Sequence, residues 1–274
     1  MTQRLSFGTG LEGLGQKTSR MPVLFIGHGN PMNAIEDNEY SRTWAELGQR
    51  LPRPKAILCV SAHWETDGTW VTAMPHPKTI HDFSGFPAKL YQMEYPAPGA
   101  PDWAQATCQM IKKVSVKPDL DWGLDHGTWA VLCRMFPKAD IPVFQLSLDC
   151  NLQPQAHYDL AQDLLPLRDQ GILIIGSGNM VHNLRLMEWT DQPFDWAVAF
   201  DQTLKKLIER RDIKALINYP ALGPNAALAI PTNEHYLPLL YALALQSKNE
   251  PLRFFSEKLT LGSISMRALQ IGVA

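Results

Sequence analysis

Short apolar runs alternate along the chain with segments of helical period, and this alternation is the feature that most constrains the fold. The clearest apolar runs occupy 22–27, 56–61, 142–148 and 171–176. Their residues are apolar at consecutive positions, which is typical of strands covered on both faces of a sheet. We therefore expect an α/β fold, with a mainly parallel or mixed central sheet and helices on both faces, in a single domain. The predicted helices cover 40–51, 102–114, 128–136, 155–169, 195–211 and 232–245, and 254–259 and 263–271 are predicted to pair as a closing hairpin.

Composition excludes several classes of protein. Lys plus Arg total 25 against 27 for Asp plus Glu, so the basic excess of a nucleic-acid binder is missing. No apolar run reaches the roughly 18 residues of a membrane span, and the first twenty residues lack the apolar core of a signal peptide. The four cysteines form no C-x-x-C pair and are expected to be reduced thiols in a cytoplasmic protein. We expect 1–20 to be a loose extension of a domain over 21–274, whose oligomeric state the sequence does not determine.

Three of the eight histidines follow predicted strands closely. His28 comes after the first apolar run, His63 after the second, and His182 after the run at 171–176. Because ligands of open α/β sheets bind beyond the carboxyl ends of the parallel strands, these imidazoles are candidates for one shared site. Converging imidazoles suit a divalent transition metal, although a lone histidine near a strand end is more often an ordinary buried polar residue.

Two further histidines lie at predicted helix starts: His126 just before 128–136, and His235 in the first turn of 232–245. His157 falls within the helix at 155–169 and is predicted to be a surface residue. His76 and His81 lie in a Pro-rich loop, 76–87, which is either a surface connection or a source of groups that face the substrate.

Other chemistries have little support in the sequence. Gly176-Ser177-Gly178 lacks the G-x-G-x-x-G spacing of a dinucleotide fingerprint. There is no G-x-S-x-G elbow and no H-E-x-x-H motif, so neither an α/β-hydrolase nor a zincin protease is indicated.

Several long motifs, in order, resemble a known family. They are MPVLFIGHGNPMNAIEDNEY, SAHWE, TIHDFSGFP, DHGTWAVL, GSGNMVHNLR and PTNEHYLPLLYALA. The chain is similar from about residue 21 to its end to the class III extradiol ring-cleaving dioxygenases of the LigB superfamily. The resemblance implies cleavage of a DOPA-like catechol by O2 at one divalent metal. It implies His28, His63 and His235 as metal ligands, and His182 as an acid/base close enough to coordinate.

Some details of this expected site stay open. Glu234 is an alternative third ligand, since distant relatives use a carboxylate. Zn(II) is expected in purified protein, whereas Fe(II) is expected for ring cleavage. We expect His126 to hydrogen-bond the substrate or oxygen with Asp125 orienting it, and Phe83, Phe86 and Trp129 to wall an aromatic slot. Two alternatives to the dioxygenase are a zinc hydrolase at the same site and a non-enzymatic interaction protein.

Overall fold

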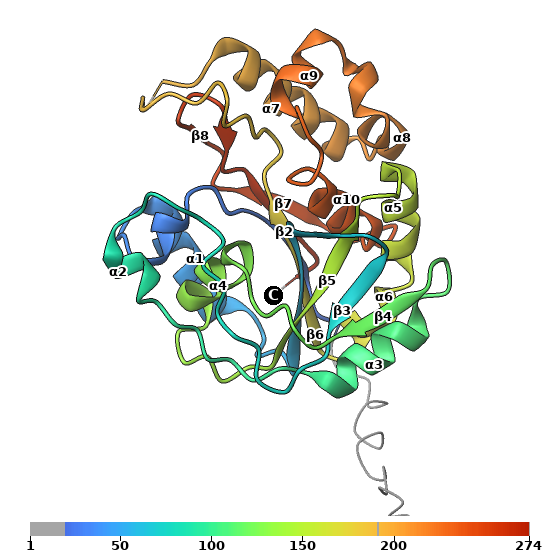
Figure 1. Cartoon of the computed structure of the whole chain (residues 1–274). Helices are drawn as coiled ribbons and strands as arrows, with labels where there is room; N and C mark the ends of the chain where they lie inside the picture. The colour runs from blue at the N-terminus through green and yellow to red at the C-terminus, as the bar shows by residue number, and fades with distance from the viewer. Residues whose placement is uncertain (1–19, 191, 274) are drawn as a thin grey trace, which may run out of the picture.

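A mixed sheet of eight strands lies at the centre of the computed structural model, which describes residues 20–190 and 192–273 (Figure 1). The strand order is β4-β3-β5-β2-β6-β1-β10-β7, and the four central strands β5, β2, β6 and β1 are parallel. A separate two-stranded pair is formed by β8 and β9. The strands are β1 (Val23–Gly27), β2 (Ala56–Thr66), β3 (Thr69–Thr72), β4 (Val116–Asp119), β5 (Val143–Asp149), β6 (Ile172–Gly178), β7 (Leu252–Phe255), β8 (Leu259–Thr260), β9 (Ile264–Ser265) and β10 (Ala268–Ile271).

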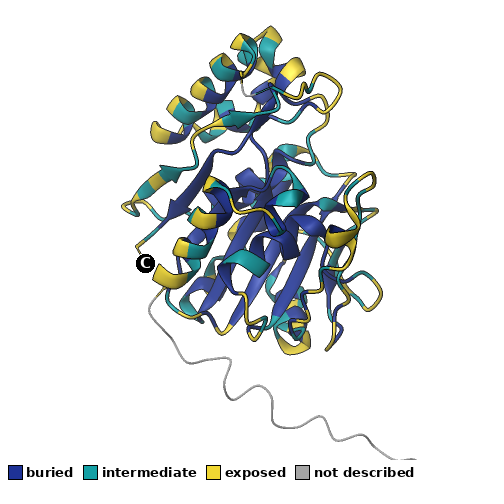
Figure 2. Ribbon diagram, turned by 90° about the vertical axis from the view of Figure 1, so that its left-hand side faces the viewer, coloured by how far each residue is buried: buried dark blue, intermediate teal, exposed yellow. Residues whose placement is uncertain are grey.

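Both faces of the central strands are buried, as the uninterrupted apolar runs predict. Along β1, Val23 and Phe25 join one hydrophobic core, whereas Leu24 and Ile26 join the core on the opposite face. Figure 2 shows the strands as a dark blue buried layer, with exposed residues on the outer sides of the helices. The predicted α/β class, with a mixed sheet and helices on both faces, is therefore confirmed.

The helices divide between the two faces. Residues of α1, α2 and α4 line the core that contains Leu24, and residues of α3 and of α5 to α10 line the core that contains Val23. In Figure 1, α1, α2 and α4 lie to the left of the sheet, and α7, α8 and α9 lie above it. The helices are α1 (Glu39–Arg50), α2 (Ala88–Tyr91), α3 (Pro101–Met110), α4 (His126–Met135), α5 (Pro154–Gln162), α6 (Leu165–Asp169), α7 (Asp195–Glu209), α8 (Ile213–Ile217), α9 (Pro224–Ala229) and α10 (Leu237–Ala244), with 3-10 turns at Pro31–Ala34 and Tyr219–Leu222.

Several predicted boundaries need correction. The single helix expected over 155–169 is two helices, and Pro166 lies in the first turn of the second, where its missing N–H is tolerated. The helix expected from residue 232 begins at Leu237, with Pro238 in its first turn. At the C-terminus, β7 pairs with β10, while β8 and β9 form a smaller hairpin between them.

The prediction for His157 is wrong. Its side chain is fully buried, and its Nδ1 lies 3.0 Å from the hydroxyl of Tyr241 on α10. Because α5 packs against α10, which itself covers the sheet, the face of α5 that carries His157 turns inward.

The predicted extension falls on residues 1–19, which lie outside the described residues, and on Arg20. The guanidinium of Arg20 donates two hydrogen bonds to the carboxylate of Asp169 and one to Ser247. All four cysteines are free, as expected. Within residues 20–190 and 192–273, no helix is long and apolar enough to cross a membrane.

Candidate metal centre

The three strand-end histidines come together because their strands are neighbours. β6 lies between β1 and β2 and is parallel to both, so the carboxyl ends of the three strands share one edge. His28 directly follows β1, and His182 follows β6 after a short loop. His63 lies inside β2, which runs on to Thr66, so the predicted end of this strand was too early. The β2–β5 register shifts between Val60 and Glu65, an irregularity of the kind that re-aims side chains near functional sites.

His235 reaches the same edge from the turn that precedes α10, and not from the helix itself. The backbone N–H of Asn179 donates to the carbonyl oxygen of His235 at 2.8 Å. A Cβ on Gly178 would lie only 2.2 Å from that oxygen, so the missing side chain permits this close approach. The glycine at the end of β6 therefore places His235 against the strand ends.

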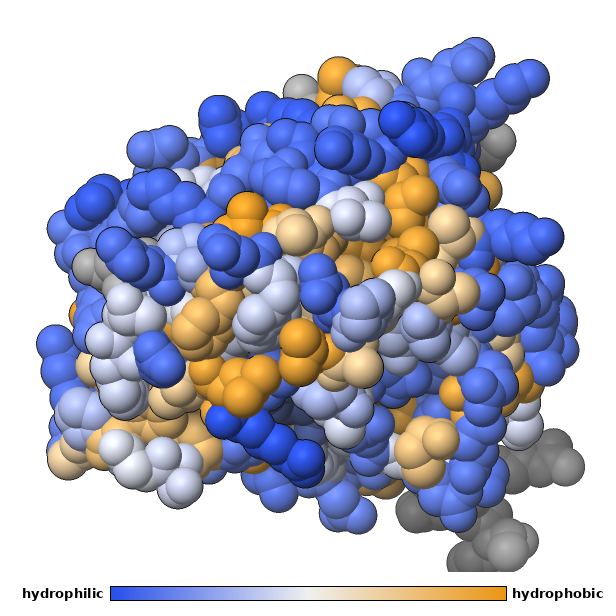
Figure 3. Space-filling view, turned by 90° about the horizontal axis from the view of Figure 1, so that it is seen from above, coloured by the Kyte–Doolittle hydropathy of each residue, from blue (hydrophilic) through white to orange (hydrophobic). Residues whose placement is uncertain are grey.

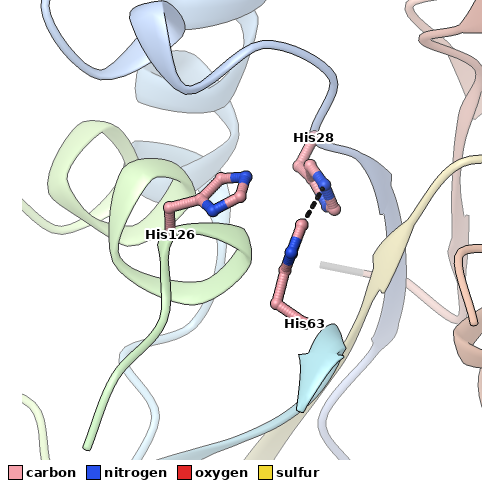
Figure 4. A group of neighbouring side chains, drawn as sticks. All are labelled: His28, His63 and His126. Atoms are coloured by element: carbon pink, nitrogen blue, oxygen red, sulfur yellow. Dashed lines mark hydrogen bonds between the residues drawn. The ribbon is translucent and has the colours of Figure 1, made fainter. Parts of the chain in front are cut away.

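Four imidazoles converge at this edge. Nε2 of His63 lies 3.1 Å from Nε2 of His28, as the dashed line in Figure 4 shows. The ring centroid of His235 is 5.4 Å from that of His28 and 5.0 Å from that of His63. His182 stacks on His235, with 3.5 Å between centroids. The structure thus brings together all four histidines that the sequence proposed for the metal site.

Hydrogen bonds orient two of these rings, those of His28 and His235, through their Nδ1 atoms. Nδ1 of His28 lies 3.0 Å from Oγ of Ser177, and that hydroxyl donates its proton to the carbonyl of Gly127 at 2.5 Å. The hydroxyl must then accept from His28, so Nδ1 carries the proton. Nδ1 of His235 lies 2.9 Å from Oε1 of Glu234, an acceptor when ionised. Both rings therefore present an unprotonated Nε2, the form that binds a metal.

This contact bears on whether Glu234 or His235 is the third metal ligand. The same Oε1 of Glu234 also accepts the hydroxyl of Thr232 at 3.1 Å. The Glu234 carboxylate thus contacts the far nitrogen of the His235 ring, and ligand atoms of His182, Glu234 and His235 lie within 4.8 Å of one another.

Burial keeps these imidazoles neutral. It lowers the pKa of His28 and His235 well below the usual range, and neighbouring histidines lower both further. The pKa of His63 falls to about 3 and that of His182 to about 4, again mainly through burial. Nε2 of His235 is buried without a hydrogen-bond partner among the described residues. Such an atom costs roughly 1–3 kcal/mol unless something satisfies it, so neutral nitrogen donors around it fit a divalent metal.

His126 lies beside this group, but the predicted role of Asp125 is wrong. His126 packs on His63 with 3.9 Å between ring centroids, and its Nδ1 lies 2.9 Å from Oδ2 of Asp82. Asp125 instead caps α4 and accepts hydrogen bonds from Ser61 and Gln145. Asp125 is adjacent in sequence, yet as N-cap its carboxylate turns toward the helix backbone. Sequence reasoning missed Asp82, although it lies beside His81 and Phe83 in the Pro-rich loop at 76–87.

The three aromatic residues predicted to wall the slot differ in position. Phe83 is partly buried, with its ring centroid 5.6 Å from that of His126 and 5.3 Å from that of Phe86. Trp129 is fully buried and donates its indole N–H to the carbonyl of Ile80. Phe83 and Phe86 therefore keep some exposed surface, whereas Trp129 keeps none.

A cavity of about 180 Å³ opens beside His182. Its lining includes Arg185, Pro231, Thr232 and Glu234. Figure 3, which looks down on the molecule from above the view of Figure 1, shows hydrophobic residues gathered near the middle of this face among hydrophilic ones. The cavity is lined mainly by polar residues and opens on the His182 side of the cluster.

Comparisons with known proteins identify relatives over most of the chain. Residues 21–266 match the family model described as the catalytic LigB subunit of aromatic ring-opening dioxygenase. The chain is 47% identical over 261 residues to a protein of Escherichia coli K12 named 4,5-DOPA dioxygenase extradiol, covering 93% of this chain and 96% of the relative. A Beta vulgaris protein of the same name is 40% identical over 243 residues, covering 86% of this chain and 91% of the relative. The crystal structure of an uncharacterized E. coli K12 protein superposes with a TM-score of 0.81 at 44% identity, over 92% of this chain and 100% of the other.

Proposed function

Because the chain belongs to the LigB family of aromatic ring-opening dioxygenases, we propose that it cleaves a DOPA-like catechol beside its two hydroxyls, with O2 and one divalent metal. Its relatives are named extradiol dioxygenases, and the chain is an enzyme of that class. The observation that carries the finer proposal is the convergence of neutral imidazoles at the strand ends, with Nε2 of His235 buried and unpartnered among the described residues.

His28, His63 and His235 would hold the metal through their Nε2 atoms. Ser177 and Glu234 fix the orientation of two of these rings. An Fe(II) ion held there would stabilise the catecholate charge and supply the redox chemistry that O2 requires, which Zn(II) cannot supply. The three imidazoles suit Zn(II) as well as Fe(II), so purified protein is expected to contain zinc.

His182 and His126 would act on different sides of the cluster, His182 as the acid/base and His126 as a hydrogen-bonding group. His182 packs on His235, and His126 packs on His63. His182 would take a proton from one catechol hydroxyl and return a proton to an oxygen of the product, two roles that an imidazole can fill near neutral pH. His126 would hydrogen-bond the second hydroxyl or O2.

Phe83 and Phe86 would form an apolar wall for the aromatic ring, with Trp129 behind them. The ring centroids of Phe83 and Trp129 are 6.2 Å apart, so the Trp129 ring would limit movement of Phe83 away from the substrate. Holding the ring against this wall orients its hydroxyls toward the histidines, which supplies proximity and orientation.

The test is to load metal-free protein with Fe(II) under anaerobic conditions, add DOPA and admit air. We expect uptake of one O2 per catechol and a yellow ring-opened product, and no uptake by a matched Zn(II)-loaded sample. Absence of O2 uptake across a panel of catechols, with Fe(II) bound, would overturn the proposal and leave a zinc-dependent hydrolase as the next candidate.

A further inference from the structure

One carboxylate in the loop at 76–87 contacts two histidines of the site. Oδ2 of Asp82 lies 2.9 Å from Nδ1 of His126 and 3.3 Å from Nδ1 of His63. The other oxygen, Oδ1, accepts the backbone N–H of His126 at 2.9 Å. Asp82 is partly buried.

These contacts determine where the proton of the His126 ring lies. An ionised carboxylate can only accept hydrogen bonds, so the proton must be on Nδ1 of His126. In the neutral imidazole Nε2 then carries the lone pair. A ring nitrogen of His126 lies within 4.8 Å of ring nitrogens of His28 and His63. Figure 4 shows the His126 ring directed toward the other two. The same oxygen attracts the proton of His63 to Nδ1, which leaves its Nε2 beside that of His28.

The backbone contact made by Oδ1 allows this role to be separated from simple helix capping. In an Asp82→Asn variant the amide oxygen can still accept the N–H of His126, which leaves the amide NH2 facing Nδ1. An NH2 group can only donate, so the His126 proton would have to move to Nε2. An isosteric change at residue 82 therefore reverses the tautomer while it preserves the hydrogen bond to the backbone N–H of His126.

We propose that Asp82 is a positioning residue that fixes the Nδ1–H tautomer of His126 and orients His63, so that both rings present an unprotonated Nε2 to the site. Its consequence for turnover rests on the proposed function, whereas its effect on the tautomer and on metal binding does not.

The experiment compares Asp82→Asn and Asp82→Ala with wild type, and with Asp102→Asn as control, since Asp102 is exposed on α3. In metal-free protein, ¹⁵N NMR of labelled histidine should show a protonated Nδ1 for His126 in wild type and a protonated Nε2 in Asp82→Asn. Calorimetric titration should give zinc affinity roughly 10-fold weaker in Asp82→Asn, the lower end of the loss seen when a ligand loses its hydrogen-bond partner. In the Fe(II)-loaded enzyme kcat should fall about 10–100-fold with little change in KM, and Asp102→Asn should match wild type throughout.

Only Asp82→Ala also loses the acceptor for the backbone N–H, so it alone should lower the unfolding midpoint markedly. An unprotonated Nδ1 on His126 in wild type would overturn the proposal, and this measurement does not depend on whether any variant folds. The proposal is also wrong if Asp82→Asn keeps both the wild-type tautomer of His126 and the wild-type zinc affinity. If wild type itself consumes no O2, the proposed function fails, while the NMR and zinc results still decide the role of Asp82.

Discussion

His182 lies face to face with His235, with 3.5 Å between ring centroids and 7° between ring planes. The two rings reach this arrangement from different elements, one from the loop after β6 and the other from the turn before α10. The backbone N–H of His182 donates to the carbonyl of Ala229, which fixes the loop independently of the His235 ring. Loss of the His182 side chain should therefore leave His235 in place.

Replacing His182 with alanine is expected to separate metal binding from turnover. His28, His63 and His235 remain, so zinc affinity of the metal-free protein should change little in a calorimetric titration. Loss of an acid/base group lowers turnover by about 10²–10⁴-fold, which an oxygen electrode would measure on Fe(II)-loaded protein. Near-normal turnover would rule out the acid/base role, and a large loss of zinc affinity would make His182 a ligand instead.

The His235→Ala substitution, unlike His182→Ala, should weaken zinc binding strongly. It removes one of the three expected ligands, so zinc affinity should fall by more than the roughly 10–100-fold that loss of a ligand's hydrogen-bond partner costs. His76→Ala is the matched control, because His76 is exposed in a loop and should bind zinc like wild type. Equal zinc affinity in both variants would exclude His235 from the metal site.

Much of this site follows from the sequence because strand patterns carry long-range information. Consecutive apolar residues imply strands buried on both faces, and parallel strands bring His28 and His182 to one edge although the two residues are far apart in the sequence. His63 was placed at the right edge despite an incorrect strand end, because the bulge in β2 changes the local register and not the direction of the strand.

The parts that were missed depend on loop conformation and tertiary packing. Asp82 lies in a segment without periodicity, so no pattern indicated which side chain its carboxylate would meet. Asp125 is adjacent to His126 in sequence, but its hydrogen bonds to Ser61 and Gln145 depend on strands far away in the chain. His157 is a polar residue on a helix, and only the packing of α5 against α10 buries it.

A Gly178→Ala substitution tests how the end of β6 supports the site. The added Cβ would meet the carbonyl oxygen of His235 at 2.2 Å, so the turn that carries His235 must shift. Overpacking of this kind costs about 1–3 kcal/mol, which urea unfolding would detect. Zinc affinity should fall as well, because the backbone that positions His235 moves. Wild-type stability together with wild-type zinc affinity would show that the close approach is not required.

The stability of the protein should depend on pH through His157, which lies on α5 and away from the metal centre. Burial lowers its pKa to about 4, below the usual value of about 6.5 in an unfolded chain, and Asp149 offsets only part of the shift. Between these two values the unfolded chain binds more protons than the folded protein, so the free energy of unfolding decreases as the pH falls from about 6.5 to 4. The full penalty, at most about 3 kcal/mol for a shift of this size, is present below the folded-state pKa.

His157→Gln removes this titration while leaving a polar partner for Tyr241, and the site histidines titrate alike in both proteins. Urea unfolding at several pH values should therefore show wild type more stable near pH 7 and the difference narrowing on acidification. A difference that stays constant from pH 7 to 4 would contradict the assignment.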